Sequence, residues 1–504
     1  MARQLLIFVH GWSVTSTATY GKLPARLKRE AARRDGPALD VRHIHLAEYV
    51  SFRDEVRIED IAHAFDSALT GILAADGGDR RCVCITHSTG APVVREWLDR
   101  FVVRADRLDA CPISHLIMLA PANFGSALAQ LGKSRLGAIK AWFDGVEPGR
   151  GVLDWLELGS ADACALNLRW IHDYPALKPT RRKPPLFPFV LCGDRIDRKL
   201  YDHLNAYTGE AGSDGVIRLA AANLNTSHVV LRQPPARAGE ALPSARKRLR
   251  SLVLDSVTRS MPTAFAIIPG KSHSGSRMGI MASVPEDGDD ATVDTVLECL
   301  AVSGADDYAA LCRRFDKRNA THQAPARRLE VEPVPVLPDR EYITDPYSML
   351  IVRLFDHDGR QVPDVDISLT AGPDADPDQL PRGFMVDRQA NPRQDGNVTF
   401  YLNHAALAGC PAIPRADGSI ARPALVPRPP YGIRLDPRHR DRFVEYWQTM
   451  LDGSTDELLD LIRPNQTTLV DIHLSRVVHR GVLGFTTQLA PPQDFKHVSP
   501  GGVA

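Results

Sequence analysis

The residues best suited to chemistry lie at positions 82–92, which read CVCITHSTGAP. An apolar run ends there at Ser88, and a helical pattern of apolar residues begins directly after it. A serine between a strand and a helix needs a turn so tight that its neighbours must be small, and Gly90 and Ala91 meet that requirement. Such a turn would lift the Ser88 hydroxyl clear of the sheet as a nucleophile. It would also direct the Thr89 amide and the helix N-terminus at the same point, where they can stabilise an oxyanion.

The pattern around Ser88 departs at one position from the G-x-S-x-G spacing typical of such turns, because Thr86 replaces the first glycine. A serine that only caps a helix is therefore an alternative interpretation. A second feature favours a catalytic role for Ser88 over a capping role. The first apolar run of the chain ends in the sequence HGW at residues 10–12. Glycine lets the backbone approach a reacting carbonyl closely, so we expect the Trp12 amide to be the second oxyanion donor and His10 to shape the loop.

A serine hydroxyl is a poor nucleophile unless a histidine accepts its proton, and that imidazole needs a carboxylate to hold its tautomer. In hydrolases with this turn the chain order is serine, then acid, then histidine. The acids that follow strand-like runs are Asp194, Asp197 and Asp214, and the histidines to be weighed are His172, His203, His228 and His273. We favour Asp214, which lies between glycines and ahead of an apolar run. We favour His273 because it follows the strand-like run 264–268 and a Pro-Gly turn.

The elements that must position these residues alternate along the first 320 residues. Apolar residues at three- and four-residue spacing predict helices at 58–73 and 94–101. Short apolar runs predict strands at Leu5–Val9, Arg81–Thr86, His115–Ala120, Leu186–Cys192 and Ala264–Ile268. This alternation predicts an α/β domain with a mainly parallel sheet. The pattern loosens at 121–185, where we expect a helical cap or, alternatively, ordinary core helices that contain Leu136, Ile139, Trp142, Phe143, Trp155, Leu156 and Trp170.

The residue pattern changes after residue 320, which indicates a second part of the chain. Prolines at 325, 333, 335 and 338 predict a stiff linker over residues 321–340. Residues 341–490 then carry short alternating runs between turn signals, which predict a β-rich, sandwich-like domain with one helix near residues 442–461. The clearest of these runs are Met349–Phe355, Val365–Leu369, Asn397–Leu402 and Thr468–Leu474. We expect residues 491–504 to form a disordered tail.

Composition excludes several classes of protein. The 504 residues include 61 Lys+Arg and 61 Asp+Glu, so we expect no nucleic-acid partner bound by bulk charge. No apolar run approaches the roughly 18 residues of a transmembrane helix. We expect no cleavable leader, because the N-terminus leads directly into a strand, and eight cysteines suit folding in a reducing cytoplasm. The acidic run 285–290 lacks the spacing of a calcium loop, and we find no zinc pattern or phosphate loop, so we expect no cofactor and no metal.

Five motifs together resemble those of a bacterial lipase or phospholipase of the α/β-hydrolase superfamily. They are HGW at 10–12, THSTG at 86–90, LAPANFGS at 119–126, GSDGVI at 212–217 and KSHSG at 271–275. Within that superfamily the chain is similar to the type VI secretion lipase effectors, which act on membrane phospholipids. The resemblance covers residues 1–320. It implies that Ser88 is the nucleophile, Asp214 the orienting acid and His273 the general base, with the amides of Trp12 and Thr89 as the oxyanion hole.

These observations predict a serine carboxylic-ester hydrolase that cleaves lipid esters through an acyl-enzyme on Ser88. Two alternatives stay open: a small-ester carboxylesterase or thioesterase with the same three residues, and a non-catalytic hydrolase-fold scaffold whose β-rich domain binds a partner. The resemblance also implies a lipid or phospholipid substrate reached by peripheral membrane contact. It further implies synthesis in the cytoplasm, export by the type VI secretion apparatus to membranes of a target cell, and an immunity protein as a further partner.

Overall fold

The computed structural model describes residues 3–10, 17–45, 54–77, 81–129, 149–174, 186–196, 211–235, 242–332, 339–394, 396–438, 444–451 and 461–478. Several features expected from the sequence lie outside these residues. They are Trp12, Asp197, His203, the tail 491–504, and the segments 130–148 and 175–185 of the expected cap.

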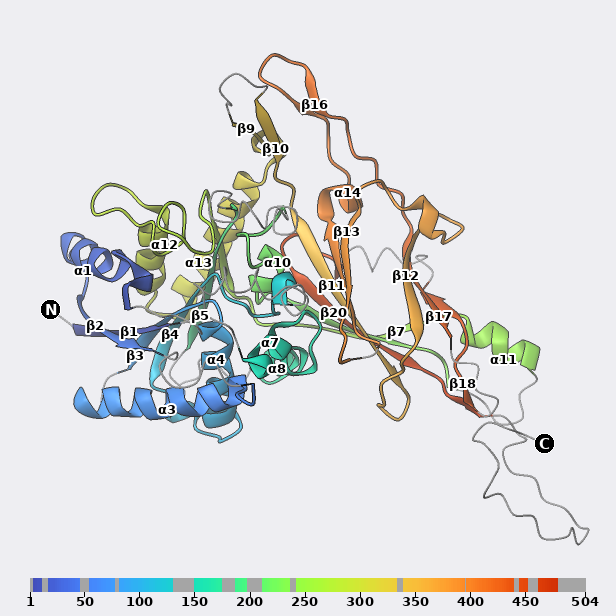
Figure 1. Ribbon diagram of the computed structural model, residues 1–504, viewed down its shortest axis with the longest axis horizontal. Coiled ribbons are helices and arrows are strands. Elements are labelled where there is room, and N and C mark those ends of the chain that lie inside the picture. The colour runs from blue at the N-terminus through green and yellow to red at the C-terminus, as the bar shows by residue number, and fades with distance from the viewer. Residues whose placement is uncertain are drawn as a thin grey trace, which may run out of the picture.

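A six-stranded sheet forms the first part of the molecule, in the order β2-β1-β3-β4-β5-β8 with every neighbouring pair parallel (Figure 1). Its strands are β1 (Arg3–Val9), β2 (Ala38–Ile44), β3 (Cys82–His87), β4 (Ile113–Leu119), β5 (Phe187–Gly193) and β8 (Ala264–Ile268). Because β3, β5 and β8 are buried along their whole length, they read as continuous apolar runs in the sequence. The edge strand β2 is partly exposed, and the sequence analysis missed it. The expected α/β fold is confirmed.

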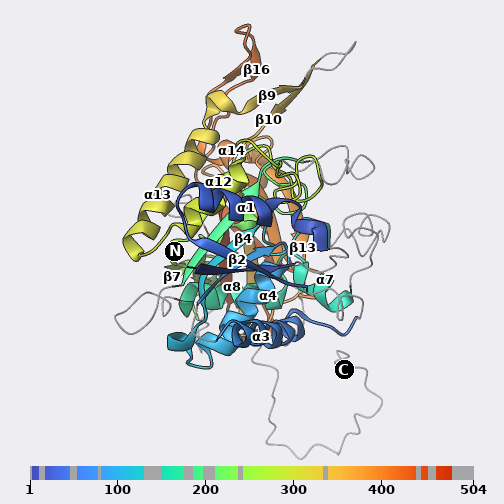
Figure 2. The ribbon, with the colours of Figure 1, turned by 90° about the vertical axis from the view of Figure 1, so that its left-hand side faces the viewer.

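Helices cover both faces of this sheet and bury a separate apolar core on each side. One face packs against α3 (Ile58–Ala75), α4 (Gly90–Trp97), α7 (Arg150–Leu156) and α8 (Ala161–His172). The other packs against α1 (Leu23–Arg33), α12 (Ala291–Leu300) and α13 (Ala305–His322). Figure 2 shows α1, α12 and α13 on one side of the sheet and α3 and α4 on the other. Within the segment 121–185, Trp155, Leu156 and Trp170 are buried in the first core, which favours core helices for α7 and α8.

The other helices in the described residues are short. They are α10 (Leu219–Ala222), α11 (Leu242–Leu249), α14 (His404–Ala408), a π-helix at Leu98–Val103 and 3-10 turns at Thr17–Tyr20, Leu108–Ala110, Pro325–Arg327 and Pro377–Gln379. Within the described part of the chain, we find no helix that combines the length and apolarity needed to cross a bilayer.

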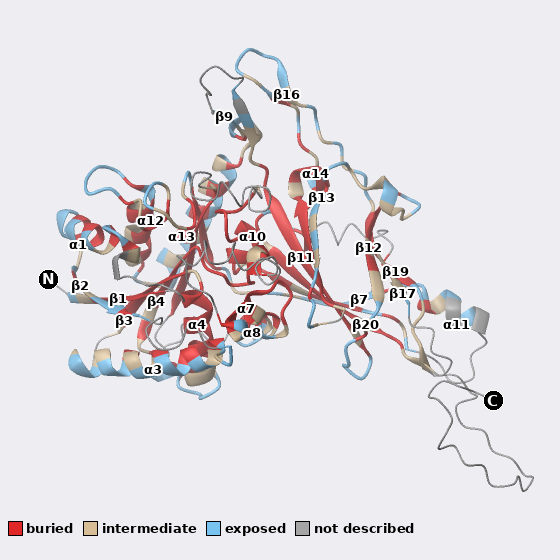
Figure 3. Ribbon diagram, in the orientation of Figure 1, coloured by how far each residue is buried: buried red, intermediate tan, exposed pale blue. Residues whose placement is uncertain are grey.

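A second sheet and a smaller third one form a β-sandwich. The second sheet has the order β13-β14-β11-β20-β6-β7, and the third has the order β12-β17-β19. The strands are β6 (Ser227–Arg232), β7 (Val253–Arg259), β11 (Tyr347–Asp356), β12 (Val365–Ala371), β13 (Met385–Ala390), β14 (Val398–Asn403), β17 (Tyr431–Pro437), β19 (Thr449–Leu451) and β20 (Thr467–Leu474). Apolar side chains from both sheets share one core, and Figure 3 shows β11 coloured as buried over most of its length. The expected β-rich domain is confirmed.

The sandwich takes two of its strands from the first 320 residues. β6 pairs in parallel with β20, and β7 pairs antiparallel with β6 at the edge of the sheet. The predicted division of the chain near residue 320 therefore does not coincide with the pairing of the strands.

Residues 321–340 and 442–461 also differ from expectation. The predicted linker contains the end of α13 and β9 (Leu329–Glu332), which pairs with β10 (Arg340–Ile343) as a hairpin. Figure 1 shows this hairpin away from both sheets, near β16 (Ile420–Arg422), which pairs with β15 (Ile413–Pro414). The predicted helix near 442–461 is wrong over its described first part, which forms β18 (Val444–Glu445) and β19. β18 pairs with β21 (Val477–Val478).

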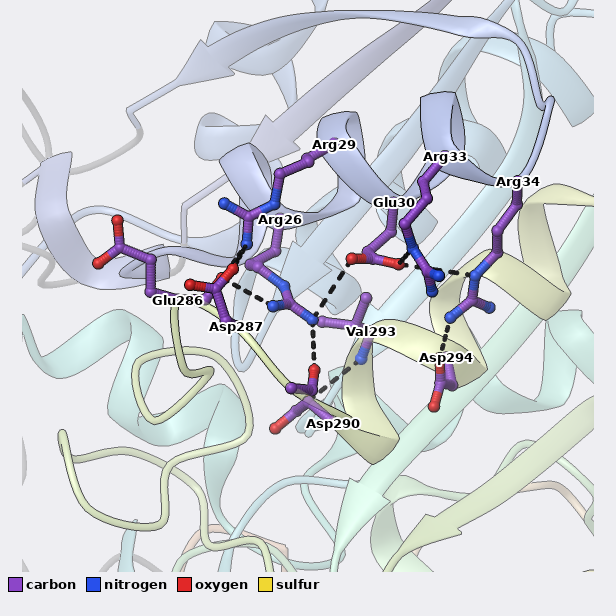
Figure 4. A network of polar contacts seen from close by, with 11 residues as sticks. Arg26, Arg29, Glu30, Arg33, Arg34, Glu286, Asp287, Asp290, Val293 and Asp294 are labelled. Atoms are coloured by element: carbon purple, nitrogen blue, oxygen red, sulfur yellow. Dashed lines mark hydrogen bonds and ion pairs between the residues drawn. The ribbon is translucent and has the colours of Figure 1, made fainter.

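The acidic run 285–290 packs against the basic helix α1 (Figure 4). The buried Arg26 donates to the carbonyls of Glu286 and Gly288 at 2.7 and 2.6 Å. Asp287 pairs with Arg29 at 2.8 Å, and Glu286 pairs with Lys22 at 2.7 Å. These acidic groups thus hold α1 against the segment that leads into α12.

Candidate active site

Ser88 follows β3 directly and precedes α4, in the tight turn that the sequence predicted. The backbone φ of Ser88 is 53°, in the left-handed region, which a residue other than glycine adopts only where its surroundings enforce it. A Cβ on Gly90 would lie 3.2 Å from the Val9 carbonyl oxygen and 3.6 Å from Thr86 Cβ. Position 90 therefore leaves little space for a side chain beside Val9, and the turn accommodates the buried Thr86 before Ser88.

A chain of hydrogen bonds joins Ser88 to His273 and Asp214. His273 Nε2 lies 3.1 Å from Ser88 Oγ, and His273 Nδ1 lies 2.9 Å from Asp214 Oδ2. Because a carboxylate only accepts, Nδ1–H donates to Asp214 and Nε2 is left to accept the serine proton. His273 and Asp214 are buried, whereas Ser88 is half-buried. This is the geometry that an activated serine nucleophile requires.

Asp214 is fixed by the backbone of its own loop. Its Oδ1 accepts hydrogen bonds from the amides of Val216 at 3.0 Å and Ile217 at 2.7 Å, which leaves Oδ2 to His273. The two loops also meet through their backbones, since the His273 amide donates to the Asp214 carbonyl at 2.9 Å. The imidazole is thus held between a fixed carboxylate and the serine hydroxyl.

His87 is a neighbour that the sequence analysis missed. Its Nε2–H donates to the His273 carbonyl at 3.1 Å, and the two ring centres lie 4.7 Å apart. Burial, followed by the charge of His273, lowers the pKa of His87 well below the ordinary histidine value. A neutral His87 therefore supports the loop that carries His273. The sequence feature that could have indicated this role is the position of His87 directly before Ser88.

The expected oxyanion donors are only partly described. Thr89 is the N-cap residue of α4 and follows Ser88 directly, so its amide lies at the positive end of that helix. Trp12 lies outside the described residues. His10 is buried beside the ring of Tyr20, and its Nε2 lies 3.1 Å from His43 Nδ1. Burial, followed by the charges of His45 and His43, lowers the pKa of His10 to about 3. These contacts suit a structural residue.

The alternative acid and bases have other partners. Asp194 accepts from His322 Nε2 at 2.6 Å and from the Gly270 amide at 2.9 Å. His228 lies in β6, where its Nε2 contacts Asp471 at 3.0 Å and its Nδ1 lies 2.9 Å from His172 Nε2. Among the described residues, no three His, Cys, Asp or Glu side chains are grouped as metal ligands.

The fold and the position of Ser88 define an α/β-hydrolase. Neither a protein-family model nor a curated protein matches the sequence. Among solved structures, the chain is similar to phospholipase PlaB from Legionella pneumophila, with 39% identity over 97% of each chain and a TM-score of 0.80. The structure of PlaB in complex with thio-NAD gives 38% identity, the same coverage and the same TM-score. The mature lipase BlEst2 from Bacillus licheniformis gives 16% identity over 44% of this chain and 80% of that chain, with a TM-score of 0.32.

The chain therefore belongs to the PlaB phospholipase family. It is a serine ester hydrolase, and the expected resemblance to lipases and phospholipases is confirmed. The alternative of a non-catalytic scaffold is not retained. The similarity to type VI secretion effectors in particular stays a prediction.

Proposed function

We propose that this protein hydrolyses phospholipid esters through an acyl-enzyme on Ser88, with His273 as general base and Asp214 as the orienting acid. The observation that carries the proposal is the continuous hydrogen-bonded chain of 3.1 and 2.9 Å from Ser88 Oγ through His273 to Asp214. The family relationship supports a lipid ester as the substrate, since PlaB is named as a phospholipase.

The reaction would proceed in two displacements. Ser88 Oγ attacks the ester carbonyl carbon while His273 Nε2 takes the hydroxyl proton, and the Thr89 amide stabilises the oxyanion. The C–O bond to the leaving alcohol breaks as His273 returns the proton to that alcohol. Water then attacks the acyl-enzyme and gives its proton to His273, the fatty acid leaves, and Ser88 regains its proton. Asp214 holds the imidazole tautomer through both displacements.

The first experiment incubates wild-type protein and the Ser88→Ala variant with mixed phospholipids and glycerides and identifies the released fatty acids and lyso products by mass spectrometry. We expect fatty acids and lysophospholipids from the wild type and none above background from the variant. Ser67→Ala, on the exposed side of α3, is the matched control and should keep full turnover. Unchanged turnover by Ser88→Ala would refute the mechanism.

The physical state of the ester distinguishes a phospholipase from a carboxylesterase or thioesterase that acts on small soluble esters. A phospholipase should gain activity when the substrate passes from monomers into micelles or vesicles. Equal turnover of short soluble esters, with none on vesicles, would favour the carboxylesterase or thioesterase alternative.

Delivery is a separate proposal that rests on the sequence resemblance alone. We propose export by type VI secretion to membranes of a target cell, with an immunity protein that protects the producer. Secretion of the tagged protein by a producing strain, compared with a strain that lacks the apparatus, tests this proposal directly.

A further inference from the structure

The loop that carries Asp214 is in direct contact with the β-sandwich. Tyr401, in the middle of β14, donates its hydroxyl to the carbonyls of Ala211 at 2.9 Å and Gly212 at 3.2 Å. These carbonyls lie two and three residues ahead of Asp214. A side chain from the sandwich therefore fixes the backbone that enters the acid loop.

Gly212 shows how closely the sandwich approaches. Its φ is 78°, and an added Cβ would overlap the Tyr347 ring and lie 2.5 Å from the Tyr401 hydroxyl. Tyr347, on β11, stacks on Tyr401 with ring centres 5.0 Å apart and planes 18° apart. The two aromatic rings thus rest directly on the loop backbone, with no side chain between them.

A second anchor lies at the far end of the same loop. The guanidinium of Arg218, a residue 2% exposed, lies 4.2 Å from the centre of the Tyr401 ring and pairs with Asp387 of β13. Ser213 and Arg218 form a β-bridge across the loop, and the Leu219 amide donates to the Gly212 carbonyl at 2.9 Å. Asp214 lies between these two anchors.

The segment that follows the loop is attached to the sandwich as well. Thr467 Oγ1, at the start of β20, donates to the Ala220 carbonyl at 2.7 Å, and Asn223 Nδ2 donates to the Asn465 carbonyl at 2.7 Å. Contacts from β11, β13, β14 and β20 therefore hold residues 211–223 along their length.

We infer that the β-sandwich is a positioning element of the active site, in which Tyr401, Tyr347 and the Arg218–Asp387 pair hold the Asp214 loop so that its carboxylate meets His273. The inference rests on the proposed function of Asp214. Tyr401 does not touch the substrate in this scheme, because it acts through the loop backbone and Asp214. Small displacements of an orienting group reduce turnover strongly. Removal of the Tyr401 hydroxyl should therefore lower kcat by a measurable amount.

The test is Tyr401→Phe, which keeps the ring and removes only the hydroxyl. Tyr446→Phe is the matched control, because the Tyr446 hydroxyl contacts Asp356 in the sandwich and not the loop. We expect Tyr401→Phe to lower kcat about 10- to 100-fold with little change in KM. We also expect a weakened downfield proton NMR signal of the His273–Asp214 hydrogen bond and a Tm close to that of Tyr446→Phe. The same kcat and the same signal in both variants would overturn the inference.

Asp387 gives a second measurement that does not depend on the folding of the tyrosine variant. Asp387→Ala removes the partner of Arg218 and should lower kcat, whereas Asp387→Glu keeps the charge and should restore most of it. Wild-type kcat in both variants would overturn the inference. Ser88→Ala separates the two claims, since an active Ser88→Ala refutes the proposed function. An inactive Ser88→Ala beside a fully active Tyr401→Phe refutes the positioning role alone.

Discussion

The turn around Ser88 keeps one of the two glycines of the usual pattern. Thr86 replaces the first glycine and is buried, whereas Gly90 keeps the second, where an added Cβ would lie 3.2 Å from the Val9 carbonyl oxygen. The departure from the pattern thus affects only one of the two small positions, and the strained φ of Ser88 is preserved.

Gly90→Ala is predicted to disrupt this turn. The added Cβ would meet the Val9 carbonyl at 3.2 Å, so we expect a loss of about 1–3 kcal/mol in the free energy of unfolding and a large loss of turnover. Gly71→Ala is the control, because an added Cβ there meets nothing within 4 Å on the exposed side of α3. That variant should gain about 0.5–1 kcal/mol. Urea unfolding and an esterase assay measure both, and a fully active, stable Gly90→Ala would contradict the prediction.

The choice between the two acids can be tested in the same way. Asp214→Asn should lower kcat by about 10⁴-fold, because the amide no longer holds the required imidazole tautomer. Asp194→Asn should leave turnover near the wild-type value, because Asp194 contacts His322 and the Gly270 amide. Steady-state kinetics on one soluble ester would distinguish the two, and equal losses would reject the assignment.

At the residue scale, much of the site could be predicted from local patterns. Ser88, Asp214 and His273 each lie beside small residues that mark a tight turn next to an apolar run, and the structure brings all three together. Tyr401 has no such mark. It lies 189 residues from Gly212 in the chain, so only the packing of the two parts reveals the contact.

At the element scale, an ion pair buried in the second sheet is linked by histidine hydrogen bonds to the helical part. Arg353 on β11 donates two hydrogen bonds, at 2.7 and 2.6 Å, to Asp471 on β20, which also accepts from His228 on β6. Burial raises the pKa of Asp471, but the hydrogen bonds from His228 and Arg353 outweigh it, and the pKa lies below the ordinary aspartate value. His228 continues the chain to His172 at the end of α8.

Arg353→Met should destabilise the protein by about 3–5 kcal/mol, because it leaves a buried carboxylate without its main partner. The double variant Arg353→Met/Asp471→Asn should regain most of that loss. Arg232→Met removes an exposed ion pair with Asp255 on the same sheet and should cost less than about 1 kcal/mol. Urea unfolding of all three is the measurement, and equal effects of Arg353→Met and Arg232→Met would contradict the prediction.

Sequence patterns predicted the buried strands well and the exposed segments poorly. β5 and β8 are apolar throughout and lie where expected, whereas β2 and β7 carry exposed polar residues and were missed. The error near residues 442–461 has another origin, since β18 and β19 are only two and three residues long and too short to show a strand pattern.

At the scale of the whole molecule, buried histidines make stability depend on pH. Burial is the main cause that lowers the pKa of His10, His87 and His115 below the ordinary value of about 6.5. The unfolded chain binds protons below that pH while these folded groups stay neutral, so stability is lost as the pH falls from about 6.5 towards the folded pKa values.

We therefore expect the free energy of unfolding to fall between about pH 7 and pH 5.5, by roughly 1 kcal/mol for each histidine that stays neutral. Urea unfolding at the two pH values measures the difference. The variant His115→Gln, which lies away from Ser88 and contacts the Val302 carbonyl, should show a smaller difference. Stability that is the same at both pH values would refute this account.

The place of β20 has a consequence for how the enzyme is made. Residues 467–474 follow β6 and β11 in the chain, yet they lie between β11 and β6, in the middle of the second sheet. A ribosome must therefore synthesise residues 467–474 before that sheet can close. A nascent chain that is cut short loses the strand that joins its two neighbours, so a truncated product lacks the completed sheet on which the finished enzyme is built.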